Sequence, residues 1–290
     1  MTIDYHITIG DPLEDAEKRN IETILQSTFS EIDALYNKWN PHSEISQINQ
    51  LQAHERHILS PEMNDFFKRI DRIVTLTGGL FDPTIEPLQN LWKSKLHKGM
   101  IPTPDELSSV RSYIGWDKIH VSDGVLSKEH SHCQMDLGGI AKGLAVDLLV
   151  ERINRSGYQN VLVEWGGEIR ATGEHPDHRP WSVYIKKTDT RVDLKDRSLA
   201  TSGDYHQLWS VTTPQGNTRS FCHIFNPLTL YPVEIRPGSV ASASVLTQDC
   251  VTADGLAKVL MMFESAEEAQ RWITGLRTEI PHLEHLMAIH

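Results

Sequence analysis

The most informative stretch of the chain is the run Met135-Asp136-Leu137-Gly138-Gly139-Ile140-Ala141-Lys142-Gly143. It places an acid, two adjacent glycines, a lysine and a third glycine at the start of an expected helix, because apolar residues then recur at about helical spacing. Glycines let a phosphate or a metal approach the backbone closely, and a helix N-terminus offers unpaired N–H groups to an anion. The alternative is a tight strand-to-helix turn in which glycine supplies a positive φ.

Length and composition bound the class of protein. With 290 residues, the chain suits one large domain or two closely associated ones. Its 28 basic and 39 acidic residues give a net charge of -11, which argues against a nucleic-acid or anionic-membrane partner. No segment approaches the roughly 20 apolar residues that a membrane-spanning helix needs. The sequence therefore predicts a globular protein with no transmembrane segment.

Cysteine and histidine give no metal or disulfide pattern. Cys133, Cys222 and Cys250 lie far apart without a CxxC pair, and the 15 histidines are scattered without HExxH. The first ten residues alternate like a strand and lack the layout of a signal peptide. We therefore expect either a cytoplasmic protein or one whose export segment was removed or lies upstream of this start.

The pattern of apolar residues and turn signals predicts a mixture of helices and strands. In the first half we expect a strand over 3–9, a helix that ends at Asn40-Pro41, a turn or short helix at 43–49, and helices opening at Ser60-Pro61 and behind the capping box at 103–106. In the second half we expect strands over 160–165, 181–186 and 240–246, a hairpin of 206–213 with 219–225, and helices over 252–263 and from 266. These elements predict one α/β or α+β unit over 1–290, with room for two interwoven lobes.

Two further motifs carry polar groups suited to a ligand. The run 78–84 places Phe81 and Asp82 after Gly-Gly, where an aromatic ring can lie against a planar ligand and a carboxylate can accept a hydrogen bond from it. Equally, Gly-Gly can end a helix and Asp-Pro can begin a turn. In the run 200–205, Thr201 and Ser202 can donate to phosphate oxygens or satisfy the end of a strand.

Two more motifs suggest acid–base and metal chemistry. His223 lies between apolar residues on an expected strand, so it is a core histidine or, if it faces a cleft, a general base. Thr252 and Asp254 suit the N-terminus of a helix. Alternatively, Asp254 is an oxygen ligand to Mg²⁺, and backbone carbonyls around Gly139 complete the site.

Taken together, these motifs resemble those of one family, the FAD:protein FMN transferases of the ApbE family. The resemblance begins at Met1 and continues through 41–46, 79–92, 136–143, 166–169, 201–205, 223–224 and 252–257, in that order. It implies an ApbE-like, two-lobed, T-fold-like α+β fold of mixed or antiparallel sheets flanked by helices.

The resemblance also implies a reaction. FAD binds with Mg²⁺, a Thr or Ser hydroxyl of a target flavoprotein attacks the FMN-side phosphorus, and AMP leaves. Phosphoryl transfer depends mostly on positioning and charge neutralisation, so this chemistry needs cations, backbone donors and a placed base. Family members usually act on subunits of ion-pumping redox complexes outside the cytoplasmic membrane. The resemblance therefore implies a redox-pump type acceptor and the periplasmic side of the inner membrane.

Site residues follow from the resemblance by position. The residues expected to contact the flavin or adenine portions are Met1, Trp39, Leu80, Phe81 and Asp82. Further contacts to FAD are expected from Asp136, Lys142 and Ile224. The Gly139 carbonyl and Asp254 are expected to bind the metal, and His223 to take the proton from the incoming hydroxyl.

The chain departs from the family pattern at three positions. Lys258 stands where a threonine usually binds the metal, and an ammonium cannot ligate Mg²⁺. Asn226 replaces an aspartate, and Leu230 replaces a glycine, which should disfavour a turn with positive φ. Two alternatives to transfer therefore stay open: hydrolysis of the FAD pyrophosphate, and an FAD-binding carrier in which Lys258 and Asn226 have removed turnover.

Overall fold

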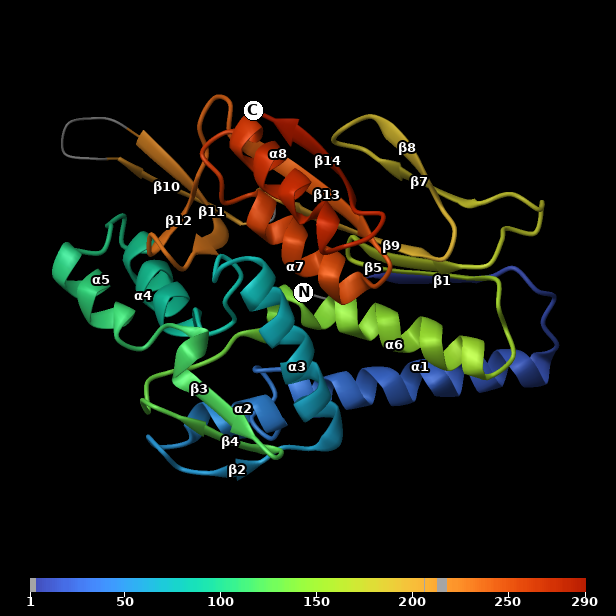
Figure 1. The fold of residues 1–290 in the computed structure, drawn as a ribbon, viewed down its shortest axis with the longest axis horizontal. Helices are drawn as coiled ribbons and strands as arrows, with labels where there is room; N and C mark the ends of the chain where they lie inside the picture. The colour runs from blue at the N-terminus through green and yellow to red at the C-terminus, as the bar shows by residue number, and fades with distance from the viewer. Residues whose placement is uncertain (1–3, 206, 213–217) are drawn as a thin grey trace.

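A six-stranded antiparallel sheet organises the chain in the computed structural model, which describes residues 4–205, 207–212 and 218–290 (Figure 1). Its strands lie in the order β1-β5-β6-β9-β13-β14. Their bounds are Tyr5–Ile9, Val161–Trp165, Glu168–Thr172, Arg197–Gly203, Val240–Thr247 and Glu284–Ile289. Every residue of β13 is buried, as expected for an inner strand that is covered on both faces.

Two helices pack on one face of this sheet. Helix α6 (Ala141–Arg155) lies on β5 and β6, and α7 (Cys250–Leu260) lies beside it on β9 and β13. Helix α1 (Asp15–Tyr36) runs along α6, and α3 (Pro61–Leu76) packs against α7 (Figure 1). The largest apolar cluster fills the space between α1, α2 (Glu44–Gln50), α3 and the start of α6.

Smaller sheets surround this centre. The hairpin of β7 (Trp181–Ile185) and β8 (Thr190–Leu194) covers the other face of the large sheet through a separate apolar cluster. The sheet β2-β4-β3 comprises His57–Ile58, Val125–Lys128 and Ile119–Ser122. The sheet β10-β11-β12 comprises Leu208–Thr212, Thr218–Asn226 and Tyr231–Glu234, and packs on α4 (Glu86–Leu96) and α5 (Pro104–Arg111). Helix α8 (Ala266–Gly275) completes the fold.

The predicted α+β class with antiparallel sheets and flanking helices is confirmed, and several elements differ in detail. Helix α1 ends at Tyr36, so Trp39 lies beyond it. The segment 43–49 forms α2, begun by Ser43, whose side chain accepts a hydrogen bond from the Ser46 amide. Helix α4 was not predicted. The turn expected at 214–217 lies outside the described residues, and no described helix is long and apolar enough to cross a membrane.

The expectation for Leu230 was wrong. Its φ is +64°, so the turn between β11 and β12 forms with a leucine in the left-handed region. The side chain is buried, and the Leu230 carbonyl accepts a hydrogen bond of 2.8 Å from Trp92 Nε1 on α4. Burial and this bond hold a conformation that costs a non-glycine residue about 1–2 kcal/mol.

Candidate functional site

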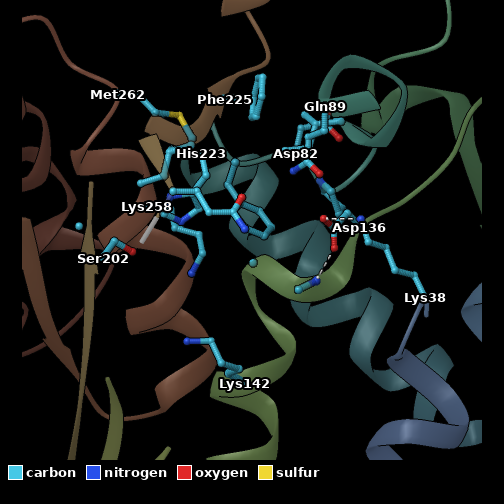
Figure 2. Close-up of a pocket in the computed structure, with 18 of the residues that line it drawn as sticks. Lys38, Asp82, Gln89, Asp136, Lys142, Ser202, His223, Phe225, Lys258 and Met262 are labelled. Atoms are coloured by element: carbon cyan, nitrogen blue, oxygen red, sulfur yellow. Dashed lines mark hydrogen bonds and ion pairs between the residues drawn. The ribbon is translucent and has the colours of Figure 1, made fainter. Parts of the chain in front are cut away.

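A cavity of about 320 Å³ lies where the large sheet and helices α6 and α7 meet α4 and the sheet β10-β11-β12 (Figure 2). Its wall comes from segments far apart in the sequence. They include the loops after α1 and α3, the start of α6, the turn between β5 and β6, and parts of β9, β11 and α7. A second cavity of about 430 Å³ adjoins the first, because both are lined by Lys38, Trp39, Asp136, Gly138 and Lys142. Each is within the usual size range of ligand pockets, ~300–1,000 Å³.

Asp82 holds the loop after α3 in shape. One carboxylate oxygen accepts hydrogen bonds from the Thr84 amide (2.8 Å) and hydroxyl (2.7 Å), and the other accepts one from the Trp116 amide (3.1 Å). Burial raises the pKa of Asp82, and the hydrogen bonds from Thr84 oppose that rise. The expected turn at Asp-Pro is therefore present, and this turn places Phe81 and Asp82 in the wall of the cavity.

Asp136 joins this loop to the glycine-rich run. Its backbone N–H donates to the Pro83 carbonyl (2.8 Å), and its Oδ1 accepts from the Gly138 amide (2.8 Å). The other carboxylate oxygen lies 2.9 Å from the Lys38 ammonium, which also pairs with Glu86. Two motifs that are separate in the sequence thus form one side of the cavity.

In the run 135–143, Gly143 allows helix α7 to approach helix α6 closely. Gly138, Gly139 and Gly143 do not have positive φ, so the alternative interpretation of a turn that needs a left-handed glycine does not hold here. A Cβ added at Gly143 would lie 2.7 Å from the Cys250 carbonyl oxygen, which is closer than real contacts allow. Glycine is therefore needed for α6 and α7 to come together.

Lys142 and Glu168 form a buried ion pair beside the cavity. The Lys142 ammonium pairs with the Glu168 carboxylate and donates to the Gly166 carbonyl at 3.2 Å. Burial raises the pKa of Glu168 to about 8; the negative charge of Asp254 adds to this rise, and the ammonium groups of Lys142 and Lys258 oppose it. Glu168 thus stays next to a lysine in a place that disfavours its charged form.

Asp254 and Lys258 form a second ion pair, on successive turns of α7. Asp254 is fully buried; its Oδ2 accepts from the Gly143 amide (3.1 Å), and its Oδ1 is bonded to the Lys258 ammonium. The aliphatic part of Lys258 passes beside Gly139, where an added Cβ would meet Lys258 Cδ and Cε at 3.4 Å. Lys258 lines the cavity with Lys142, so both ammonium groups lie at its α6–α7 side (Figure 2).

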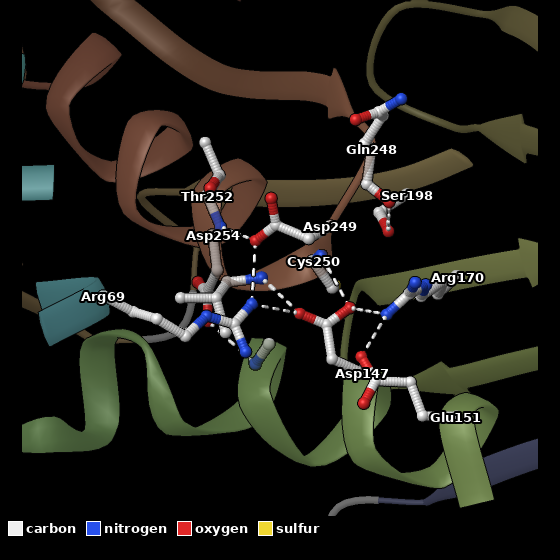
Figure 3. Close-up of polar contacts among 12 residues, drawn as sticks. Arg69, Asp147, Glu151, Arg170, Ser198, Gln248, Asp249, Cys250, Thr252 and Asp254 are labelled. Atoms are coloured by element: carbon white, nitrogen blue, oxygen red, sulfur yellow. Dashed lines mark hydrogen bonds and ion pairs between the residues drawn. The ribbon is translucent and has the colours of Figure 1, made fainter. Parts of the chain in front are cut away.

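An ionic network around the buried Asp147 carboxylate fixes the start of α7 (Figure 3). The N-cap is Asp249, whose side chain accepts from the Thr252 amide at 2.9 Å, so capping by Thr252 or Asp254 was wrong. Arg69 of α3 bridges Asp249 and Asp147 of α6, at 2.9 and 2.8 Å. The network thereby sets where α7 presents Asp254 and Lys258.

The sequence model that describes the ApbE family matches residues 1–283 of this chain. The chain belongs to the ApbE family. Relatives from Chlamydia pneumoniae and Chlamydia muridarum are 37% and 38% identical over 274 residues, which cover 94% of this chain and 85% of each relative. A relative from Vibrio cholerae is 33% identical over 256 residues, covering 85% of this chain and 74% of its own length. All three are named FAD:protein FMN transferase.

Solved structures of ApbE proteins share the fold. The flavin transferase ApbE from Vibrio cholerae superimposes with a TM-score of 0.78 at 29% identity, covering 98% of this chain and 89% of that one. The flavinyl transferase ApbE from Pseudomonas stutzeri, in its apo form, gives a TM-score of 0.81 at 23% identity and covers 100% and 92%, a likeness that shows the fold. The family and the fold that the motifs predict are confirmed.

Most of the residues expected from the ApbE pattern meet at the cavity. Its wall contains Trp39, Leu80, Phe81, Asp82, Asp136, Gly139, Lys142, His223 and Ile224. Trp39 lies at the rim with 79% of its surface exposed, whereas Asp254 is buried behind Lys258. Met1 lies outside the described residues. The individual roles of these residues stay predictions.

Several lining residues were not named as site residues from the sequence, among them Lys38, Gln89 and Glu168. Glu168 is part of the Gly-Gly-Glu-Ile motif, and its burial next to a lysine depends on how β6 meets α6. Gln89 belongs to α4, whose Pro at the first turn and Leu88, Leu91 and Trp92 at helical spacing were a usable signal. Lys38 carried no local signal, because its partners Asp136 and Glu86 are distant in sequence.

The residues around Asp254, as arranged, do not fit the magnesium ion expected there. Mg²⁺ requires near-octahedral oxygen coordination, but one Asp254 oxygen accepts from Gly143 and the other is bonded to the Lys258 ammonium. An ammonium about 4 Å from a divalent cation is repelled by on the order of 8 kcal/mol at an effective dielectric constant of about 20. Within the described part of the chain, no three His, Cys, Asp or Glu side chains gather to hold a metal.

Proposed function

We propose that this protein transfers the FMN moiety of FAD to a Thr or Ser hydroxyl of an acceptor flavoprotein, with release of AMP. One observation carries the proposal: the family's separate motifs converge on a single cavity, and lysines line it. The names of the relatives, FAD:protein FMN transferase, support this choice of reaction.

The cavity pair suits a dinucleotide with two flat ends and a charged middle. Phe81 and Ile224 supply apolar wall to the first cavity, and Phe29, Tyr36 and Trp165 supply it to the second. Lys38 and Lys142 belong to both cavities, so cationic side chains lie where the two adjoin. A pyrophosphate placed there would receive charge-assisted hydrogen bonds from lysine.

The transfer step needs one proton acceptor. The acceptor hydroxyl oxygen attacks the FMN-side phosphorus and forms a new P–O bond, while the P–O bond to the AMP phosphate breaks and AMP keeps its electron pair. His223, on β11 in the cavity wall, is the residue to which we assign the hydroxyl proton, since imidazole titrates near neutral pH. The lysines stabilise the charge that develops on phosphate oxygens.

Magnesium was expected to assist this reaction at Gly139 and Asp254. That expectation stays a prediction from the family pattern. The oxygen ligands expected for the metal do not favour it, because Asp254 is bonded to the Lys258 ammonium. No step above is therefore written through a metal. We carry forward, from the resemblance alone, an acceptor of the redox-pump type and a periplasmic location; the alternative location is cytoplasmic.

A flavinylation assay tests the proposal. The purified protein is mixed with FAD and an acceptor flavoprotein that the Vibrio cholerae relative labels, with that relative as the positive control. Transfer gives a fluorescent acceptor band in a denaturing gel and one AMP per labelled acceptor. FMN and AMP without a labelled acceptor would indicate the hydrolase, and bound FAD with neither product would indicate the carrier; either result contradicts transfer.

A further inference from the structure

The Lys258 ammonium occupies a distinctive position in the cavity. It is bonded to a carboxylate that is fully buried, yet it belongs to the cavity wall, whereas Asp254 lies behind it. A Cβ added at Gly139 would contact the stem of Lys258, so Lys258 lies next to both positions that were expected to bind a divalent cation. The structure thus places a positive charge, carried by a side chain of α7, beside the two residues expected to bind the metal.

The chemistry of an ammonium suits a phosphate at this place. An ammonium has three N–H donors and no acceptor. One donor is directed to Asp254 Oδ1, with the Asp254 carbonyl oxygen at the longer distance of 3.5 Å. Because Lys258 still lines the cavity, a further donor can reach a phosphate oxygen there. Lysine binds phosphate as a point charge, which is also what a cation offers to a pyrophosphate.

Two other lysines of the cavity wall are paired with carboxylates, and a third, Lys93 of α4, also lines the cavity. Lys142 pairs with Glu168, and Lys38 pairs with both Glu86 and Asp136. Asp254 and Glu168 are two buried carboxylates close to each other. Without Lys258, the Asp254 carboxylate would have no counter-charge of its own, and a buried carboxylate needs one. Lys258 supplies that counter-charge from within the chain.

We propose that the Lys258 ammonium takes the place of the divalent cation, so that this protein binds the pyrophosphate of FAD, and transfers FMN, without a divalent metal. The transfer part rests on the proposed function; the binding part does not. The proton and bond changes of the reaction are unaltered, because Lys258 donates hydrogen bonds to phosphate oxygens and stays charged.

Measurements on the unaltered protein give the first test. FAD affinity is measured by quenching of flavin fluorescence, in excess EDTA and then in millimolar Mg²⁺, and FMN transfer is followed under the same two conditions. We expect the FAD affinity in EDTA to agree with that in Mg²⁺ within about threefold, and the rate of FMN transfer likewise. A threefold change is well below the effect of one charged hydrogen bond. Binding of Mn²⁺ alone, followed by electron paramagnetic resonance, should show no tight site.

Substitutions at position 258 give the second test. Lys258→Met should weaken FAD binding in EDTA by roughly tenfold to a hundredfold, the cost of one charged hydrogen bond. Lys258→Thr should show the same loss in EDTA, recover in Mg²⁺ and gain a Mn²⁺ site, because the threonine frees Asp254. The control is Lys68→Met, which removes the same charge from an exposed helical pair with Asp65 and should leave FAD binding unchanged.

Two results would overturn the inference. The first is loss of FAD binding or of transfer in EDTA with recovery in Mg²⁺ for the unaltered protein. The second is Lys258→Met binding FAD in EDTA as well as the unaltered protein does. Metal-free FAD binding without transfer, under both conditions and with a competent acceptor, would instead reject the proposed function and leave the role of Lys258 in binding supported. Thermal unfolding of each variant confirms that it is folded.

Discussion

Asp147, in the middle of α6, accepts a hydrogen bond of 2.8 Å from the backbone N–H of Cys250, the first residue of α7. Its second carboxylate oxygen accepts one of 3.1 Å from the next amide, that of Val251. These two N–H groups have no partner within α7, so Asp147 satisfies them from a neighbouring helix. The carboxylate is fully buried and carries the counter-charge for Arg69 and Arg170, at 2.8 Å each.

Asp147→Asn should therefore lower the free energy of unfolding by about 3 kcal/mol, since it removes the buried carboxylate that pairs with both arginines. Arg69 and Arg170 keep one acidic partner each, Asp249 and Glu151, which limits the loss. Urea unfolding measures the change. Asp65→Asn, which removes an exposed carboxylate paired with Lys68, is the control and should change stability by less than about 1 kcal/mol. Equal effects of the two substitutions would contradict the structural role of Asp147.

Gly143→Ala should destabilise the protein although alanine favours helices. The added Cβ would lie 2.7 Å from the Cys250 carbonyl oxygen and would push α7 away from α6. We expect a loss of about 1–3 kcal/mol, as for overpacking of a core, after a gain of up to about 1 kcal/mol in helix propensity. Gly275→Ala on α8 meets nothing within 4 Å and should be neutral or stabilising. A gain in stability for both alanine variants would contradict the close contact of α6 and α7 at Gly143.

Glu168 should make stability depend on pH. Its pKa is raised to about 8 in the folded protein, first by burial and then by Asp254, against an ordinary value of 4.5. The folded state therefore binds more protons than the unfolded state between these values, so the free energy of unfolding falls as pH rises from about 5 to 8. The slope from this one group is at most roughly 1.4 kcal/mol per pH unit.

Denaturant unfolding of the unaltered protein and of Glu168→Gln across this range checks the prediction. Every other ionisable group is the same in both proteins, so the difference between the two curves isolates Glu168. As pH rises, the free energy of unfolding of Glu168→Gln should increase relative to that of the unaltered protein, because the neutral amide has no charge to bury. A constant difference from pH 5 to 8 would show that Lys142 keeps Glu168 ionised throughout.

Local patterns predicted the helices well because caps and apolar spacing are local. Ser60 caps α3 and Thr103 caps α5, as the sequence indicated, and each accepts a hydrogen bond from the amide three residues on. In the large sheet, strands β6, β9 and β14 were not predicted, and in the smaller sheets β2, β3, β4, β8 and β12 were not. Strand β9 is a run of mostly small, buried residues whose partners in β6 and β13 lie far away in the sequence.

The cavity was predictable only as far as whole motifs identify it. Asp82 and Asp136 could be named from their motifs, but their hydrogen bonds to Trp116 and Lys38 depend on tertiary packing. Lys258 was recognised as a departure from the family pattern. That it pairs with Asp254 follows from their spacing of four residues on one helix, whereas its position at the cavity follows from where α7 meets α6.

His223→Gln should separate catalysis from binding. The amide keeps much of the shape of the imidazole but cannot accept a proton at neutral pH, so FMN transfer should slow by about 10²–10⁴-fold. FAD affinity, measured by flavin fluorescence, should change little, because we assign His223 to the incoming hydroxyl. A variant that transfers FMN at the original rate, or one that loses FAD altogether, would remove His223 from the role of general base.

Leu230 offers a test of strain against burial. Its positive φ would suit glycine, but its side chain is buried in the cluster that includes Trp92 and Phe221. Leu230→Ala loses the buried side chain and keeps a Cβ in the strained conformation, and should cost about 2–5 kcal/mol. Leu230→Gly loses the same packing but relieves about 1 kcal/mol of strain. Urea unfolding should therefore rank the unaltered protein first, the glycine variant second and the alanine variant last. An alanine variant as stable as the glycine variant would show that this turn relaxes to a negative φ when the leucine is removed.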